Sequence, residues 1–207
     1  HSQQQGRFLY HVARLRPSHL SAHGYGACEL SLDNDVLALG QISLVRASGL
    51  FPDGMPFSFD QGSNLVLEVP ADARDELVYL ALPQEKQSGV NIASGANGQV
   101  ARYIMGGVSM LDDSVEEGEE EDVGLAWLNP CLRLGREDMA GYVALPIARI
   151  VEVVNEKEVR LDRDFIAPCL DVGLMSPLSS FLRETLSMVK QRAKALADRM
   201  QKGAEQS

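Results

Sequence analysis

The segment 176–202 places the strongest constraint on what this chain can fold into. Ser176 and Pro177 suit the cap and the first turn of a helix, and neither another proline nor a glycine occurs before about Lys202. At about 1.5 Å per residue, a helix of this length reaches roughly 38 Å. The sequence therefore predicts one long C-terminal helix, longer than packing onto a small domain requires.

The apolar residues of this segment recur at heptad spacing. They are separated by 4, 3, 4, 3 and 4 positions, and they are Leu182, Leu186, Val189, Ala193, Leu196 and Met200. This spacing is typical of helices that associate with other helices along one seam. We expect these six residues to form an oligomerisation seam. A helix that lies along its own domain is the alternative, and the spacing alone leaves the number of subunits open.

The rest of the chain predicts mainly short strands joined by turns. About eight to ten runs alternate or are rich in aliphatic residues and end at Pro, Gly, Asn or Asp; they are 25–32, 41–45, 55–59, 64–69, 76–82, 100–105, 123–128, 131–134, 142–154 and 159–161. Pro146 lies inside the longest run, where we expect a sheet edge or a bulge. A short helix is expected between Ser2 and Pro17. The predicted fold is an antiparallel β-sandwich or jelly-roll-like body with a helix at each end.

One turn has a specific composition. In Phe51, Pro52, Asp53 and Gly54, the proline suits the second position of a turn and the glycine can take positive φ. Aromatic residues alternate on the strand that follows, which indicates a hairpin. We interpret the turn as architectural, with direct contact to a partner as the alternative.

The net charge of −10 is concentrated in one segment. Eight acids and no base lie between Asp112 and Asp122, and without them the charge is only −2. Such a run predicts a solvated acidic loop, with a basic partner or a cation as the less favoured reading. The negative net charge argues against a nucleic-acid-binding protein, which usually carries a basic surface.

The residue types that carry chemistry form no recognisable site. The four histidines lack a metal-binding pattern, and glycine-rich phosphate loops and a nucleophile elbow are absent from the sequence. We therefore expect no catalytic residue, no metal and no cofactor. Three widely separated cysteines, each in an apolar stretch, predict buried thiols in a reducing compartment, hence the cytoplasm. No apolar run approaches the roughly 20 residues of a membrane span, so membrane insertion is not expected.

Five motifs, in order along the chain, resemble those of the TssK (ImpJ/VasE) family of type VI secretion baseplate proteins. They are H-x-Q-Q-Q-x-R at 1–7, G-L-F-P-D-G-M-P-F at 49–57, D-E-L-V-Y-L-A-L-P at 75–83, L-P-I-A-R-I at 145–150 and L-D-x-x-F-I-A-P-C-L at 161–170. Ala167 stands where the family more often has proline. The acidic segment matches no motif of the family.

The resemblance implies a shoulder β-sandwich over residues 1–175, similar to the shoulder of phage receptor-binding proteins, and the start of a helical neck over 176–207. It also implies a homotrimer that anchors to the wedge proteins TssF and TssG. Contact with the membrane complex is expected only through a C-terminal head that these residues do not include. The expected function is that of a non-enzymatic structural adaptor.

The alternative function is a carbohydrate-binding β-sandwich. Such a module usually presents aromatic platforms to sugars, and Trp127 is the one tryptophan of the chain. Aromatic residues make up 6% of the sequence, which favours the adaptor.

Overall fold

The computed structural model describes residues 23–60, 65–85, 92–93, 101–111 and 120–204. Its strands are β1 (Gly26–Leu32), β2 (Gln41–Leu50), β3 (Pro56–Phe59), β4 (Val66–Glu68), β5 (Arg74–Pro83), β6 (Ile92–Ala93), β7 (Tyr103–Leu111), β8 (Glu120–Leu128), β9 (Cys131–Leu134), β10 (Tyr142–Val154) and β11 (Glu158–Leu161). Its helices are the 3₁₀ helices η1 (Asp35–Leu39) and η2 (Val172–Leu174) and the α-helix α2 (Ser176–Ala204). The predicted β-rich fold with a long C-terminal helix is confirmed. The helix expected between Ser2 and Pro17 lies outside the described residues.

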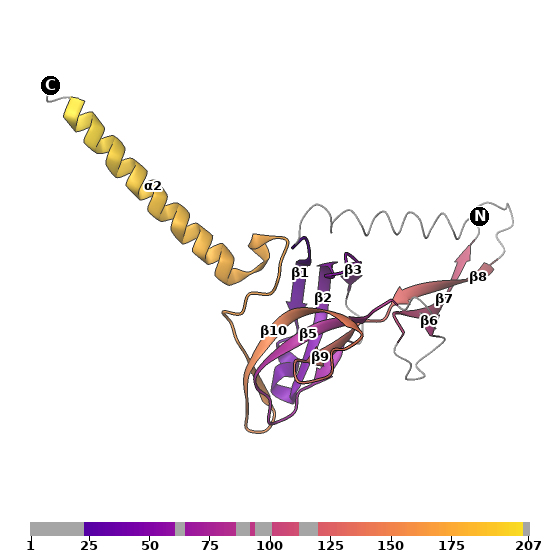
Figure 1. Cartoon of the computed structure of the whole chain (residues 1–207). Coiled ribbons are helices and arrows are strands. Elements are labelled where there is room, and N and C mark those ends of the chain that lie inside the picture. The colour runs from indigo at the N-terminus through magenta and orange to yellow at the C-terminus, as the bar shows by residue number, and fades with distance from the viewer. Residues whose placement is uncertain (1–22, 61–64, 86–91, 94–100, 112–119, 205–207) are drawn as a thin grey trace.

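Two four-stranded antiparallel sheets form the body (Figure 1). In the first sheet β2 pairs with β1, β3 and β4, and in the second the order is β11-β10-β5-β9. Alternation along β2 shows why the sheets face each other, because Ile42 and Leu44 are buried whereas Gln41 and Ser43 are partly exposed.

Both sheets contribute to one hydrophobic core. Its central members come from β2, β3, β5, β9, β10 and β11, and they are Ile42, Leu44, Phe57, Val78, Leu80, Leu82, Leu132, Leu134, Leu145, Ile150 and Val159. Each such side chain contributes roughly 1.5–3 kcal/mol when it leaves water. The body is therefore a β-sandwich, as the sequence predicts.

The longest strand contains the bulge expected at its proline. Pro146 pairs with Tyr79 of β5, and the next paired residue is Ala148 opposite Val78, so Ile147 is the extra residue. The buried positions change phase there, because Leu145 and Ile147 are followed by Ala148 and Ile150. On its other side β10 pairs with β11 only from Ile150 onward. Pro146 thus lies where its missing N–H breaks no ladder.

A third sheet, which we call the arm, consists of β6, β7 and β8 and extends to one side of the sandwich (Figure 1). Its two long strands exceed the predicted runs, since β7 reaches Leu111 and β8 begins at Glu120. The prediction of a loop over 112–122 is therefore wrong for its last three acids, which pair with β7. A run of acidic residues predicts only that the side chains are in water. The backbone of such residues can still form the hydrogen bonds of a β-ladder. Residues 112–119 lie outside the described part of the chain.

The prediction of three buried thiols is wrong for Cys28. All three cysteines are free; Cys28 is exposed, and Cys131 and Cys169 are partly buried. Strand alternation is the reason, because Ala27 faces the interior and Cys28 faces solvent. Burial raises the pKa of the Cys131 thiol above its usual value.

After β11 the chain passes beside β1 and then enters α2. The Ala27 N–H donates to the Pro168 carbonyl at 2.9 Å, and the Leu170 N–H donates to the Ala27 carbonyl at 2.8 Å. After η2, α2 projects away from the body (Figure 1), and its side chains from 180 to 201 are exposed. The predicted long helix is confirmed, and the alternative that it lies along its own domain is wrong.

The close pairing of β1 with β2 predicts a steric effect at Gly49. A Cβ there would lie 2.2 Å from the Gly26 carbonyl oxygen, at a φ of +157°. We expect Gly49→Ala to lower the free energy of unfolding by about 2–3 kcal/mol in urea denaturation. Gly141→Ala is the matched control, since Gly141 has a φ of +81° with nothing within 4 Å of its Cβ position, and should cost only about 1 kcal/mol of backbone strain. Equal losses in the two variants would contradict the proposed clash.

Candidate functional site

The turn from Phe51 to Gly54 joins β2 to β3 with the expected hairpin geometry. The Phe51 N–H donates to the Met55 carbonyl at 2.9 Å, and the Gly54 N–H donates to the Phe51 carbonyl at 2.8 Å. Gly54 has a φ of 80°, in the left-handed region. Phe51 is fully buried, and its ring centroid lies 4.7 Å from that of Phe57. Pro52 is exposed at the tip. The turn is therefore held by the buried Phe51, and its tip faces solvent.

The carboxylate of this turn forms a buried ion pair. One Asp53 oxygen accepts the Met55 N–H at 3.1 Å, and the other lies 2.7 Å from Nη2 of Arg102. Arg102 is 1% exposed and is the one buried charged side chain of the described residues. Removing either partner of a buried pair costs about 3–5 kcal/mol, because the other charge stays desolvated. Sequence reasoning missed Arg102. The one sequence signal for it is a single arginine at the start of an otherwise apolar run.

The second set of predicted site residues lies on α2. Leu182, Leu186, Val189, Leu196 and Met200 are each more than half exposed, and Ala193 is also exposed. The structure thus places all six on a helix that touches little of its own chain. Their role as an oligomerisation seam stays a prediction.

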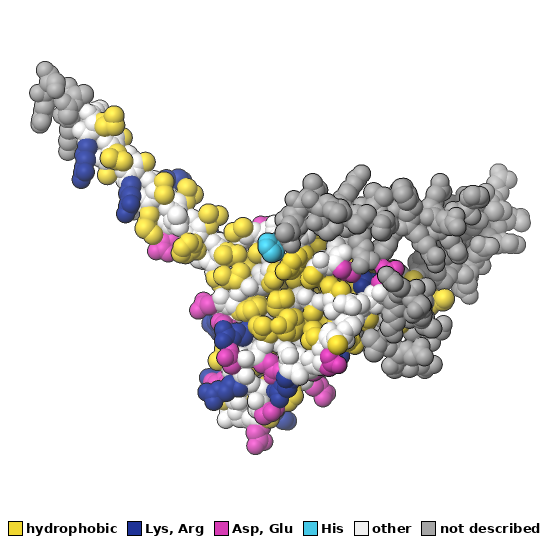
Figure 2. Space-filling view, in the orientation of Figure 1, with side chains coloured by type: hydrophobic (Ala, Val, Ile, Leu, Met, Phe, Trp, Pro, Cys, Tyr) yellow, Lys and Arg dark blue, Asp and Glu magenta, His cyan; other side chains and the backbone are white. Residues whose placement is uncertain are grey.

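Apolar surface continues from the helix toward the body. Leu170 and Val172, in the segment that leads into α2, are 43% and 50% exposed. Figure 2 shows hydrophobic side chains along the helix and on the adjoining face of the sandwich. Contiguous apolar surface of this kind marks interaction sites in soluble proteins. Sequence reasoning assigned the helix but not this extension.

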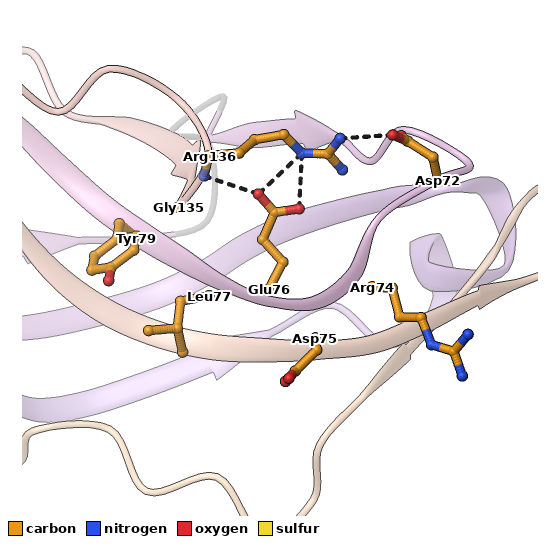
Figure 3. A pocket seen from close by; sticks show the side chains of 8 residues that line it. All are labelled: Asp72, Arg74, Asp75, Glu76, Leu77, Tyr79, Gly135 and Arg136. Carbon is orange, nitrogen blue, oxygen red and sulfur yellow. Dashed lines mark hydrogen bonds and ion pairs between the residues drawn. The ribbon is translucent and has the colours of Figure 1, made fainter.

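A charged hollow lies at the N-terminal end of β5 (Figure 3), lined by Asp72, Arg74, Asp75, Glu76, Leu77, Tyr79, Gly135 and Arg136. Arg136 contacts Asp72 at 2.9 Å and Glu76 at 2.9 Å. Its guanidinium holds the pKa of Asp72 below the usual value, and the two carboxylates raise the pKa of Arg136. A general acid requires a raised carboxyl pKa, so this pairing does not prepare one. It is a surface ion-pair network.

An apolar hollow lies between β3 and the base of the arm. Its lining residues are Pro56, Phe57, Ser58, Phe59, Trp127 and Leu128. Trp127 is 52% exposed, and the ring of Phe57 stacks on Phe59 at 5.5 Å. A sugar site needs polar groups placed to bind hydroxyls, and here only Ser58 has a polar side chain apart from the indole N–H. The hollow therefore favours apolar contact over carbohydrate binding.

The described residues offer neither a metal site nor a membrane-spanning helix. Those residues contain no group of three or more His, Cys, Asp or Glu side chains that could hold a metal ion. Their helices also include none that is long and apolar enough to cross a membrane.

The positive φ of the turn predicts a stability effect at Gly54. Gly54→Val should lower the free energy of unfolding by about 1–3 kcal/mol, because a β-branched residue resists that conformation. Thermal melting measures the effect, with Pro52→Ala at the exposed tip as the control. If Gly54→Val melts like the wild type yet loses binding to partner proteins, the turn is a contact site and the architectural interpretation is wrong.

The chain matches known proteins along its whole length. A model of the bacterial type VI secretion family of EvfL, ImpJ and VasE matches residues 1–207. The type VI secretion baseplate component TssK1 of Pseudomonas aeruginosa PAO1 is 33% identical over 205 residues, which cover 97% of this chain and 46% of TssK1. The chain thus spans about half the length of this curated relative.

Solved structures share the fold. A crystal structure of TssK superposes with a TM-score of 0.87 at 26% identity, covering 97% of this chain and 46% of that chain. A chain of the TssK–TssF–TssG baseplate subcomplex superposes with a TM-score of 0.79 at 24% identity, covering 95% of this chain and 66% of that chain. The sandwich with its projecting helix is thus a known arrangement. Because the family model covers every residue, the chain belongs to the ImpJ/VasE family of bacterial type VI secretion proteins.

Proposed function

We propose that this chain is the shoulder and the first part of the neck of a type VI secretion baseplate adaptor. In this proposal residues 1–175 are the shoulder domain, and residues 176–207 begin the neck. The main support is the superposition on the TssK crystal structure over 97% of the chain, which includes both the sandwich and α2. The role is structural and not enzymatic, in keeping with the description of TssK1 as a baseplate component.

The proposed partners are wedge proteins of the TssF and TssG type. One structure with this fold belongs to a TssK–TssF–TssG baseplate subcomplex, and another belongs to a baseplate complex of the type VI secretion system. In this proposal the sandwich anchors to the wedge, at the cytoplasmic side of the membrane. In this proposal the link to the membrane complex is made by a C-terminal head, as the resemblance to the TssK family implies, and not by the sandwich or α2.

The proposed assembly is a parallel homotrimer held by α2. The seam residues form an apolar stripe on a helix whose side chains from 180 to 201 are all exposed in the single chain. A stripe of this size is rarely left in water. Self-association follows from the stripe, whereas the number three follows from the resemblance to the TssK family.

The seam predicts loss of association on charge insertion. The double change Leu186→Asp and Val189→Asp should convert the oligomer to a folded monomer in sedimentation velocity at micromolar concentration. Each buried leucine at a seam contributes roughly 1.5–3 kcal/mol per chain, and a buried carboxylate adds a further penalty.

The control for this experiment is the double change Ser187→Asp and Gln191→Asp. It adds the same charge on the opposite face of the same turns and should leave the oligomer intact. A monomeric wild-type chain would contradict the seam as an autonomous association element.

The adaptor role predicts capture of wedge proteins. A tagged chain of residues 1–207, co-expressed with TssF- and TssG-type proteins of the same secretion system, should co-purify with them. An unrelated β-sandwich with the same tag is the control. A folded, oligomeric chain that captures neither protein would contradict the proposed anchoring.

A further inference from the structure

The hydrogen-bonded strand pairs of the sandwich do not explain the direction in which the arm extends. In the described residues β7 pairs with β6 and β8, and none of the three pairs with a strand of the sandwich. The arm nevertheless has a defined direction, out to one side of the body (Figure 1). The contacts that fix this direction must therefore lie at its base.

Arg102, which immediately precedes β7, joins the arm to two other segments. Its Nη2 contacts Asp53 of the β2–β3 turn at 2.7 Å, and its Nη1 donates to the Pro83 carbonyl at the end of β5 at 2.9 Å. A guanidinium is planar and rigid, so two acceptors on different segments fix both its position and its orientation. Arg102 thus relates the start of the arm to both sheets of the sandwich.

Asn129, which follows β8, connects the other strand of the arm to the same point. Its backbone N–H donates to the Arg102 carbonyl at 2.9 Å, and its side-chain amide donates to the Ala101 carbonyl at 3.0 Å. The two ends of the β7–β8 hairpin are therefore tied together beside the arginine. Any rotation of the hairpin about its base must move Arg102 relative to Asp53 or Pro83.

The burial of the ion pair makes it selective for one geometry. The side chain of Arg102 is fully buried and that of Asp53 is 14% exposed, so separating the pair leaves the Arg102 charge desolvated and without its counter-charge. An apolar pair of similar size would hold the core together without such directional demands. A buried pair of this kind suits a contact that specifies one arrangement among several.

We propose that the Asp53–Arg102 ion pair is a positioning contact that sets the direction of the arm, beyond any contribution to the stability of the sandwich. One consequence of this direction is the apolar hollow, where Trp127 of β8 lies across from Phe59 of β3. Without the pair, the hairpin pivots at its base and Trp127 leaves the hollow. This inference does not depend on the proposed adaptor function.

The chain contains its own reporter for the arm. Trp127 is the one tryptophan of the sequence, so fluorescence of the full chain, excited at wavelengths that its five tyrosines do not absorb, reports this side chain alone. Arg102→Met should shift the emission maximum to longer wavelength. Acrylamide quenching should rise by up to about twofold, since the exposed fraction of Trp127 can increase from 52% to full exposure. Asp53→Asn keeps the shape of the turn and should give a smaller shift in the same direction.

Arg136→Met is the matched control. It also removes an arginine bonded to carboxylates, but Arg136 contacts the N-terminal end of β5 at Glu76, whereas Arg102 contacts the C-terminal end at Pro83. Its Trp127 emission and quenching should equal those of the wild type. Circular dichroism and cooperative melting show whether each variant keeps the sandwich.

Two results would overturn the proposal. In one, Arg102→Met and Asp53→Asn retain the folded sandwich and Trp127 fluoresces as in the wild type, so the arm keeps its direction without the pair. In the other, both variants lose cooperative melting, and the pair then stabilises the sandwich as a whole. A folded sandwich with a shifted Trp127 emission in both variants supports the positioning role.

Discussion

The shared core of the two sheets is the constraint on which the rest of this structure depends. Each sheet has one apolar face, and neither face can stay in water, so the two cover each other through residues such as Ile42, Leu80 and Leu145. β5 and β10 form the longest paired stretch of the second sheet, from Tyr142 opposite Pro83 to Glu152 opposite Arg74. The arm and α2 both attach at the margins of this core.

Two elements leave the sandwich, and they are held in different ways. The arm is fixed at its base by a buried ion pair and by the hydrogen bonds of Asn129. The helix α2 is preceded by a short backbone contact between Ala27 and the segment around Cys169, and no described element covers its apolar side chains. The arm is thus oriented by its own chain, whereas the apolar face of the helix stays exposed. This division is consistent with the proposed function, in which the helix joins copies of the chain.

The charges are distributed in keeping with this division. Arginines pair with nearby carboxylates at the end of the sandwich away from the helix: Arg136 with Asp72 and Glu76, Arg149 with Asp75, and Arg160 with Glu152. Figure 2 shows basic and acidic side chains gathered on the part of the sandwich farthest from the helix, and hydrophobic ones on the part next to it. Exposed pairs of this kind contribute about 0–1 kcal/mol each, so their main effect is to keep that end hydrated.

The sequence by itself determined the elements whose signals are local. The run of aliphatic residues over 142–154 matches β10, Pro146 indicates an edge or a bulge and the structure has the bulge, and the heptad spacing after Ser176 predicts α2. Only the tertiary structure decided how Asp53 meets Arg102, 49 residues away, why Cys28 is exposed, and where Glu120 joins a strand. Periodicity reports the nearest neighbours along the chain. The partner of a buried charge and the solvent side of a strand depend instead on which distant segments share the core.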